Sequence, residues 1–222
     1  MLNFGNMEES PMPISETYNI DCLEAMREMP DNAFQLACVD PPYGLGIASN
    51  PVRQMHAVKS WDSAVPTEEY FTELRRVSVN QIIWGGNYFP LPPTQNLIVW
   101  DKKQPFNFSL AQSEFAWCSI QRPSKTFSMS PIGAGKFHPT QKPVALYKWL
   151  LTNYAKPSDK ILDTHLGSQS SRIAAWDLGF DFVGYELDAD YFREGNERFE
   201  RHRAQPTLFE AVKIEQTQSQ LF

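Results

Sequence analysis

The chain has 222 residues, a mass of 25.5 kDa and 42% hydrophobic residues, enough to bury one good core. No stretch approaches the roughly 18 apolar residues of a membrane span, and Glu8 and Glu9 stand where an exported protein has a basic leader, so we expect a cytosolic protein. The net charge of −6 counts against a nucleic-acid partner, and three scattered cysteines count against a disulfide framework or a metal site.

The negative charge is unevenly distributed. Residues 101–150 carry seven Lys or Arg against two acids, a net +5 that leaves −11 for the rest of the chain. A basic middle on an acidic body can still steer a polyanion to one face. The cations that are candidates for contacting nucleic-acid phosphates are Arg53, Lys59, Lys102, Lys103, Arg122, Lys125 and Lys136.

The N-terminal third begins with a polar, aperiodic stretch, residues 1–16, which we expect to be a mobile extension. A short strand is predicted over residues 18–21. Apolar residues at helical spacing predict a helix over 22–29, stopped by Pro30, and a buried strand follows over 34–39.

The sequence Asp40-Pro41-Pro42-Tyr43 comes directly after that strand. Two successive prolines cannot extend a helix or a central sheet ladder, so they turn the chain sharply and hold a carboxylate and an aromatic ring on one rigid loop. A pocket for a flat, amino-bearing ring needs this pair of groups, although a stiff surface turn would look the same. The next loop, 48–64, is long enough to be functional or mobile.

The middle of the chain predicts a helix and three strands. Thr67 is expected to cap a helix that ends near Arg75 and Arg76 and buries Leu74 and Val77. The strands are predicted at 81–84, 96–100 and 114–120. The irregular, basic segment within 102–136 carries aromatic residues, which suits base stacking, although a core with exposed lysines explains it almost as well.

The last third alternates regularly between helices and strands. Helices are predicted at 144–154, through 176–178 up to Gly179, and at 189–202, with strands at 160–163 and 182–186. This alternation predicts an α/β fold, a mostly parallel sheet with helices on both faces, in one domain over 17–203 followed by a tail over 204–222.

The unit from Asp163 to Glu186 has the layout of an adenosine-binding site: a strand, a loop, a helix, and a strand that ends in an acid for ribose hydroxyls. The 23-residue spacing is close to the roughly 20 expected. The loop has one glycine, Gly167, and no G-x-G-x-x-G, which disfavours NAD and FAD and favours a cofactor without phosphates, such as S-adenosylmethionine. A purely structural unit remains an alternative at this point.

Four polar side chains, His138, Thr140, Gln141 and Lys142, cluster before the helix at 144–154, with Pro143 suited to its first turn. Taken alone, they could simply cap a helix entry.

With these motifs together, the chain resembles the permuted, beta-group DNA amino-methyltransferases of phage or restriction-modification type. The motifs are Asp-Pro-Pro-Tyr-Gly at 40–44, His-Pro-Thr-Gln-Lys-Pro at 138–143, Ile-Leu-Asp-x-x-x-Gly-Ser at 161–168 and Gly-Tyr-Glu-Leu-Asp at 184–188. They follow the order of that group over residues 17–203. The resemblance implies a Rossmann-like fold with permuted motifs, S-adenosylmethionine as cofactor and adenine in DNA as substrate.

The resemblance also implies the role of each motif residue. Asp40 and the Pro41 carbonyl would accept amino hydrogens of a base flipped from the duplex, in a pocket completed by Pro42, and Tyr43 would stack on that base. Glu186 would bind the ribose hydroxyls. The remaining cofactor contacts would come from Asp21 and Cys22 at the adenine, and from Asp163, Gly167, Ser168, His138, Thr140, Gln141 and Lys142 at the methionine end.

The cofactor loop departs from the family pattern Asp-Pro-Phe-x-Gly-Ser-Gly-Thr, since Thr164 and His165 replace Pro and Phe, and Gln169 replaces the second Gly. We expect Gln169 to avoid a positive φ and to keep its side chain out of the pocket, with weakened cofactor binding as the consequence.

Target recognition would come from the loop at 48–64 and the insert at 102–136. This is little material, so the target would be short or relaxed, or recognition would be shared across a homodimer.

The tail contains two Gln-x-x-Leu-Phe sequences, at 205–209 and 218–222, which resemble peptides that dock bacterial sliding clamps; a tail without such a partner is the alternative. Alternatives for the activity are methylation of the cytosine amine, of RNA or of a protein glutamine, and a DNA-binding module that has lost activity.

Overall fold

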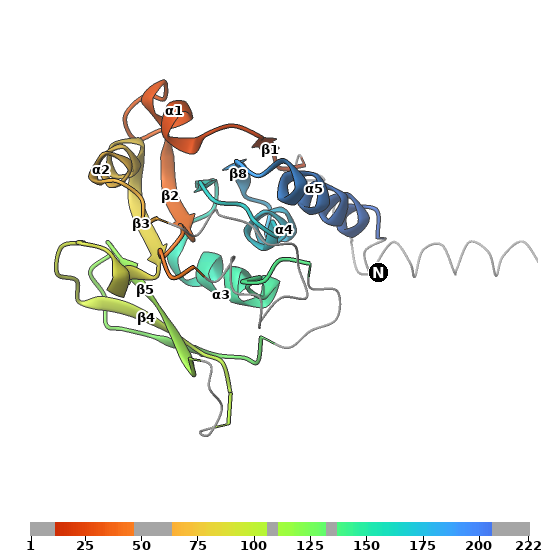
Figure 1. Cartoon of the computed structure of the whole chain (residues 1–222). Coiled ribbons are helices and arrows are strands. Elements are labelled where there is room, and N and C mark those ends of the chain that lie inside the picture. The colour runs from red at the N-terminus through yellow and green to blue at the C-terminus, as the bar shows by residue number, and fades with distance from the viewer. Residues whose placement is uncertain (1–11, 47–63, 106–110, 132–136, 206–222) are drawn as a thin grey trace, which may run out of the picture.

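The computed structural model describes residues 12–46, 64–105, 111–131 and 137–205 (Figure 1). An eight-stranded sheet in the order β1-β8-β7-β2-β3-β5-β4-β6 forms the centre of this part of the chain. Its strands are β1 (Ser15–Tyr18), β2 (Phe34–Val39), β3 (Ser78–Trp84), β4 (Asn96–Asp101), β5 (Ser113–Cys118), β6 (Thr126–Ser128), β7 (Lys160–Asp163) and β8 (Asp181–Tyr185). Only β5 runs antiparallel to its neighbours, which confirms the predicted mostly parallel sheet.

Helices cover both faces of the sheet, as predicted (Figure 1). They are α1 (Cys22–Arg27), α2 (Glu68–Val77), α3 (Val144–Tyr154), α4 (Ser170–Asp177) and α5 (Ala189–Arg203), with a 3-10 turn, η3, at Gly86–Tyr88. The helices α1 and α2 pack with the side of β2 that carries Ala37 and Val39, whereas α3 and α4 pack with the side that carries Leu36 and Cys38. In the strand order, β3 lies on one side of β2 and β8 lies on the opposite side of β7, so the two crossover connections run in opposite directions along the sheet. Because both crossovers are right-handed, their helices, α2 and α4, lie on opposite faces.

Two edge strands differ from the predictions. The strand predicted at 18–21 lies earlier, at Ser15–Tyr18, where it pairs with β8, so the boundary of the N-terminal extension at residue 16 is wrong. The short strand β6 lies in the segment predicted to be irregular. Both strands have alternately exposed and half-buried side chains, so backbone pairing with a neighbour, and not an apolar pattern, defines them.

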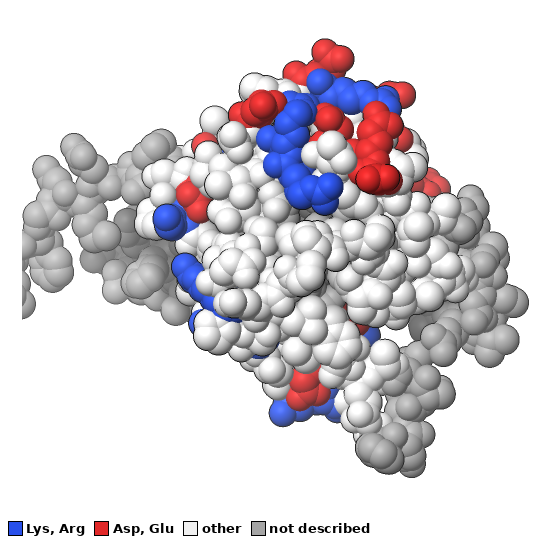
Figure 2. All heavy atoms as spheres, turned by 90° about the vertical axis from the view of Figure 1, so that its left-hand side faces the viewer, with Lys and Arg blue, Asp and Glu red and all other residues white. Residues whose placement is uncertain are grey.

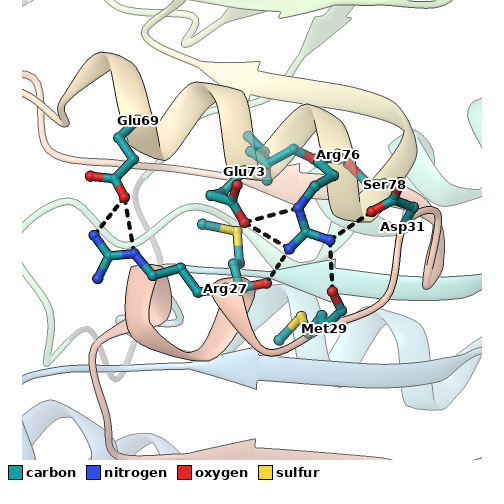
Figure 3. Close-up of polar contacts among 9 residues, drawn as sticks. Arg27, Met29, Asp31, Glu69, Glu73, Arg76 and Ser78 are labelled. Carbon is teal, nitrogen blue, oxygen red and sulfur yellow. Dashed lines mark hydrogen bonds and ion pairs between the residues drawn. The ribbon is translucent and has the colours of Figure 1, made fainter.

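The first two helices are joined by Arg76, near the end of α2 (Figure 3). Its guanidinium donates to the main-chain oxygens of Met26 and Met29, at 2.6 and 2.7 Å, and to the carboxylates of Asp31 and Glu73. The last carbonyls of a helix lack some of their intrahelical partners, so this side chain adds donors at and just after the end of α1, where the Met26 carbonyl also accepts from the Met29 amide, and it holds α2 beside α1. As predicted, Thr67 caps α2, accepting from the Tyr70 amide.

Among the residues that the structure describes, no helix combines the length and hydrophobicity that a membrane crossing requires. Cys38 and Cys118 are buried and unpaired, as expected for small core residues, while Cys22 is partly exposed.

Candidate active site

A cavity of about 640 Å³ opens where the carboxyl ends of β2, β7 and β8 meet. This is the point at which the strand order reverses, the usual ligand site of a doubly wound sheet, and the volume suits a small-molecule ligand. The cavity is lined by Ile20, Asp21, Cys22, Asp40, Pro42, His138, Thr140, Gln141, Lys142, Tyr147, Thr164, His165, Leu166, Gly167, Ser168, Ser170, Glu186, Leu187, Asp188 and Tyr191.

The structure therefore brings most of the predicted site residues together, although they come from opposite ends of the chain. All the predicted cofactor residues line the cavity except Asp163, and of the four predicted catalytic residues Asp40 and Pro42 do so. Pro41 is buried beside the cavity and Tyr43 points elsewhere.

Glu186, at the end of β8, is fixed by two backbone amides. Its Oε2 accepts from the Gly167 amide at 2.8 Å and its Oε1 from the Asp188 amide at 2.9 Å. Burial raises the pKa of this carboxyl group, and the two amides oppose that effect. Gly167 has a φ of +45°, and a Cβ at this position would lie 3.3 Å from His138 Nε2. Glycine therefore suits both the left-handed backbone and the close approach of the loop to His138.

Asp163 lies behind the cavity. Its carboxylate accepts from the His165 amide at 3.0 Å and from the Ser171 hydroxyl at 2.5 Å, which fixes the loop between β7 and α4. Burial raises the pKa of Asp163 to about 7. The contacts make Asp163 an anchor of the loop, and they give no geometric support to the predicted contact with the methionine end.

Both oxygens of Asp40 are engaged. The Tyr43 hydroxyl donates to Oδ1 at 2.6 Å, and the Lys142 ammonium lies 2.5 Å from Oδ2. The Tyr43 ring stacks on Tyr88, with ring centroids 5.1 Å apart, and lies over Gly85, where a Cβ would be 2.3 Å from the ring. Tyr43 is thus not among the residues that line the cavity, and its stacking on a target base stays a prediction.

Sequence reasoning missed a chain of hydroxyl and imidazole groups beside the cofactor loop. The Tyr70 hydroxyl lies 2.7 Å from Thr164 Oγ1, which lies 2.9 Å from His165 Nδ1. Burial lowers the pKa of His165 to about 4, so its imidazole is neutral at physiological pH. The signal that could have found this pair is that Thr164 and His165 stand where the family has Pro and Phe.

Tyr191 was also missed. Its ring meets the His138 ring edge-on at 4.3 Å, and both line the cavity. Its position in the first turn of the helix after Glu186 was the available signal.

Gln169 corrects one expectation and agrees with another. Its φ is +59°, in the left-handed region that we expected it to avoid. The side chain does stay outside the cavity: Oε1 accepts from Arg172 Nη1 at 2.9 Å, and the amide nitrogen lies 3.3 Å from Asn196 Oδ1. The space comes from Gly195 in α5, where a Cβ would be 2.7 Å from Gln169 Cγ. The reason given for weakened cofactor binding therefore has no geometric basis.

The described candidate DNA contacts are not among the residues that line the cavity. Lys102 is paired with Glu114 and its side chain is 14% exposed, whereas Lys103 is 60% exposed beside Asp101. Arg122 and Lys125 both donate to Asn153 at the end of α3, and α3 begins next to the cavity, so the structure places them at the far end of the sheet. Figure 2, the side that carries α2, shows basic side chains mixed with acidic ones over α1 and α2 and few charges below.

The other candidates, Arg53, Lys59 and Lys136, lie outside the described residues, as do the loop at 48–63 and nearly all of the two tail sequences.

Comparisons with known proteins agree with the motifs. Residues 99–197 match the family model N6_N4_Mtase, described as DNA methylase. Type II methyltransferase M.HinfI of Haemophilus influenzae is 22% identical in an alignment 254 positions long, which covers 88% of this chain and 71% of that protein.

Solved structures share the fold. The M1.HpyAVI-SAM complex aligns with a TM-score of 0.57 and 18% identity over 82% of this chain and 98% of that one. PvuII DNA methyltransferase, named as cytosine-N4-specific, aligns with a TM-score of 0.58 and 13% identity over 95% of this chain and 94% of that one.

Proposed function

We propose that the chain is a member of the DNA methylase family, an S-adenosylmethionine-dependent methyltransferase that methylates the exocyclic amine of adenine in double-stranded DNA. The observation that carries this proposal is that Asp40 and Glu186, which follow different strands, line one cavity. One end can hold a cofactor while the other receives an amino group.

The cavity residues fit S-adenosylmethionine. Asp21, Asp40, Glu186 and Asp188 give the lining an excess of carboxylates, which suits a cationic ligand and disfavours a phosphate. The side-chain oxygen of Gln141 is buried at the cavity without a hydrogen-bond partner among the described residues, so it is an available acceptor for an ammonium group. Glu186, held by two amides, would bind the ribose hydroxyls. When bound, S-adenosylmethionine supplies a methyl group on a positively charged sulfur.

Asp40 and the Pro41 carbonyl would activate the amine. An aromatic amine is a poor nucleophile because its lone pair is delocalised into the ring. Two acceptors that draw its hydrogens out of the ring plane localise that pair, and the loop then contributes mainly by alignment. The amine lies inside the duplex, so the base must be flipped out to reach Asp40.

Adenine is favoured over cytosine because the motif begins with Asp and not Ser. Mass spectrometry of nucleosides from DNA incubated with the protein and S-adenosylmethionine tests this. We expect N6-methyladenine from the wild type and none from Asp40→Asn, with cofactor binding retained. N4-methylcytosine would contradict the choice of adenine. No transfer to DNA would contradict the proposal, and transfer to RNA instead would replace it.

The role of Glu186 can be tested by cofactor titration. Glu186→Gln retains the size of the side chain but loses the charge, and a hydrogen bond to a charged group contributes about 1.5–3 kcal/mol. We expect the dissociation constant for S-adenosylmethionine to rise by about 10- to 100-fold. Glu194→Gln, on the exposed side of α5, is the matched control and should leave it unchanged. Equal affinities of Glu186→Gln and wild type would contradict the role.

A further inference from the structure

Four charged side chains meet next to the candidate catalytic loop. The Lys142 ammonium lies between two carboxylates, 2.5 Å from Asp40 Oδ2 and 3.1 Å from Glu114 Oε2, and Lys102 pairs with the other oxygen of Glu114. The side chains of Lys142, Lys102, Asp40 and Glu114 are 2%, 14%, 17% and 23% exposed. The group balances two positive and two negative charges in a site nearly closed to water.

Glu114 has this position because of the register of β5. In this strand Ala116 and Cys118 point to the side of the sheet that packs on α3, and strand alternation puts Glu114 on that side as well. Glu114 pairs across the ladder with Trp100 of β4. A carboxylate on an inner face is costly unless it is paired, and here its partners are two lysines from other segments.

The charges depend on one another. Burial alone raises the pKa of Glu114, but the Lys142 and Lys102 ammonium groups outweigh it and hold that pKa below its ordinary value. Burial alone lowers the pKa of Lys142, but Asp40 and Glu114 outweigh it and hold that pKa above its ordinary value. Both groups therefore remain ionised at neutral pH.

Other titratable groups also face this cluster. Cys38 in β2, Tyr43 in the loop after it and Tyr147 in α3 are all protonated, because burial raises their pKa values well above the ordinary ones.

We propose that Glu114 is a positioning residue for methyl transfer: it holds the Lys142 ammonium, which in turn fixes Asp40 for the target amine. This inference rests on the proposed function. Lys142 lies on Oδ2 of Asp40, which leaves Oδ1, the oxygen that accepts from the Tyr43 hydroxyl, as the more available acceptor for the amine hydrogen. With Glu114 sharing the ammonium, Asp40 keeps its orientation without being fully neutralised by Lys142.

Replacing Glu114 by Gln tests the idea by kinetics. Misplacement of a reacting group by about 1 Å can cost about 100-fold in rate, so we expect kcat to fall by about 10- to 100-fold with little change in the dissociation constant for DNA. Lys142 would keep one carboxylate partner instead of two. The alkaline decline of kcat in Glu114→Gln should therefore begin at a lower pH than in the wild type, while Glu114→Asp should restore part of the wild-type profile. A role limited to folding would lower the melting temperature without moving the profile.

The matched control is Asp101→Asn, which removes a carboxylate that pairs with Lys103 at the same edge of the sheet. It should leave kcat and its pH profile unchanged. An unchanged kcat and an unmoved profile in Glu114→Gln would overturn the proposal.

A second measurement does not need activity. The side-chain carbon next to the Lys142 ammonium, labelled with ¹³C and assigned with Lys142→Arg, should titrate at a lower pH in Glu114→Gln than in the wild type. Equal titrations would overturn the proposal even if no substrate were methylated. If the wild type transfers no methyl to DNA, but the Lys142 titration still moves to a lower pH in Glu114→Gln, the proposed function is contradicted and the coupling of Glu114 to Lys142 is supported.

Discussion

Gln169→Gly restores the glycine that the family loop has at this position, and the structure predicts that it destabilises the protein. Gln169 stands at the N-cap position of α4 with a left-handed backbone and no capping hydrogen bond from its side chain, which lies in a buried network between α4 and α5. Glycine would relieve the left-handed conformation, worth about 1–2 kcal/mol. It would also give the unfolded chain more freedom, which removes about 0.5–1 kcal/mol of that gain.

The losses are larger. Arg172 would lose an acceptor, and a hydrogen bond to a charged group contributes about 1.5–3 kcal/mol. The vacated space over Gly195 would cost about 2 kcal/mol if it stays empty, as in other large-to-small core changes. The net expectation is a loss of about 2–5 kcal/mol. For a domain of this size that is a fall in melting temperature on the order of 5–20 °C.

The assay compares urea unfolding and S-adenosylmethionine titration for wild type and Gln169→Gly. Because the side chain lies outside the cavity, the dissociation constant should change by less than about threefold while stability falls, since only a direct contact would cost the roughly 1.4 kcal/mol of a tenfold change. A more stable variant, or one that binds the cofactor about tenfold more tightly, would refute this reasoning.

A double-mutant cycle with Gly195→Ala sharpens the test. In the wild type the added Cβ would lie 2.7 Å from Gln169 Cγ, so Gly195→Ala should be destabilising. In Gln169→Gly the space is vacant, and alanine in a helix interior is favoured over glycine by about 1 kcal/mol, so the same substitution should become stabilising. Additive effects would show that the two residues do not compete for this space.

Further predictions concern pH and the contact between α1 and α2. The free energy of unfolding of the ligand-free protein should fall with rising pH between about 4 and 7 through Asp163, which is protonated more readily when folded, and rise between about 4 and 6.5 through His165, which is protonated less readily when folded. Relative to the wild type, Asp163→Asn should therefore gain stability with rising pH and His165→Phe should lose it. Urea titrations at several pH values give the free energy of unfolding, and the same dependence of this free energy on pH in all three proteins would contradict the prediction. Arg76→Met removes the guanidinium donors to the carbonyls of Met26, in α1, and Met29, just after it, and should cost about 1–3 kcal/mol by urea titration. Glu73→Gln, which removes one ion pair, should cost less than about 1 kcal/mol; equal losses would contradict the role of the carbonyl contacts.

The central strands and the cavity were predictable because local signals agree with the fold. The run from Phe34 to Val39, apolar except for Gln35, predicts a buried strand, and it is β2. The carboxyl ends of parallel strands converge, so residues that follow β2, β7 and β8 had to come close together wherever they lie in the sequence. The ends of the sheet carried no such signal, because the pairing of Ser15–Tyr18 depends on the backbone of β8.

Side-chain directions within the site were not predictable, because each is decided by a residue outside the motif. Gly85 gives Tyr43 a place to pack, Gly195 makes room for Gln169, and Glu114 draws Lys142 towards Asp40. A motif specifies which groups are present and roughly where the backbone carries them. The rotamers follow from neighbours that only the tertiary structure brings into contact.

These neighbours also define what must move before Tyr43 can stack on a base. In the proposed reaction Asp40 Oδ1 accepts an amine hydrogen beside, or in place of, the Tyr43 hydroxyl that donates to it at 2.6 Å, because a carboxylate oxygen has two lone pairs. For Tyr43 to stack on the base, its ring would have to leave Tyr88. A displacement of Tyr43 would supply the stacking surface, and Asp40 keeps its place meanwhile because Lys142, held by Glu114, stays on its other oxygen.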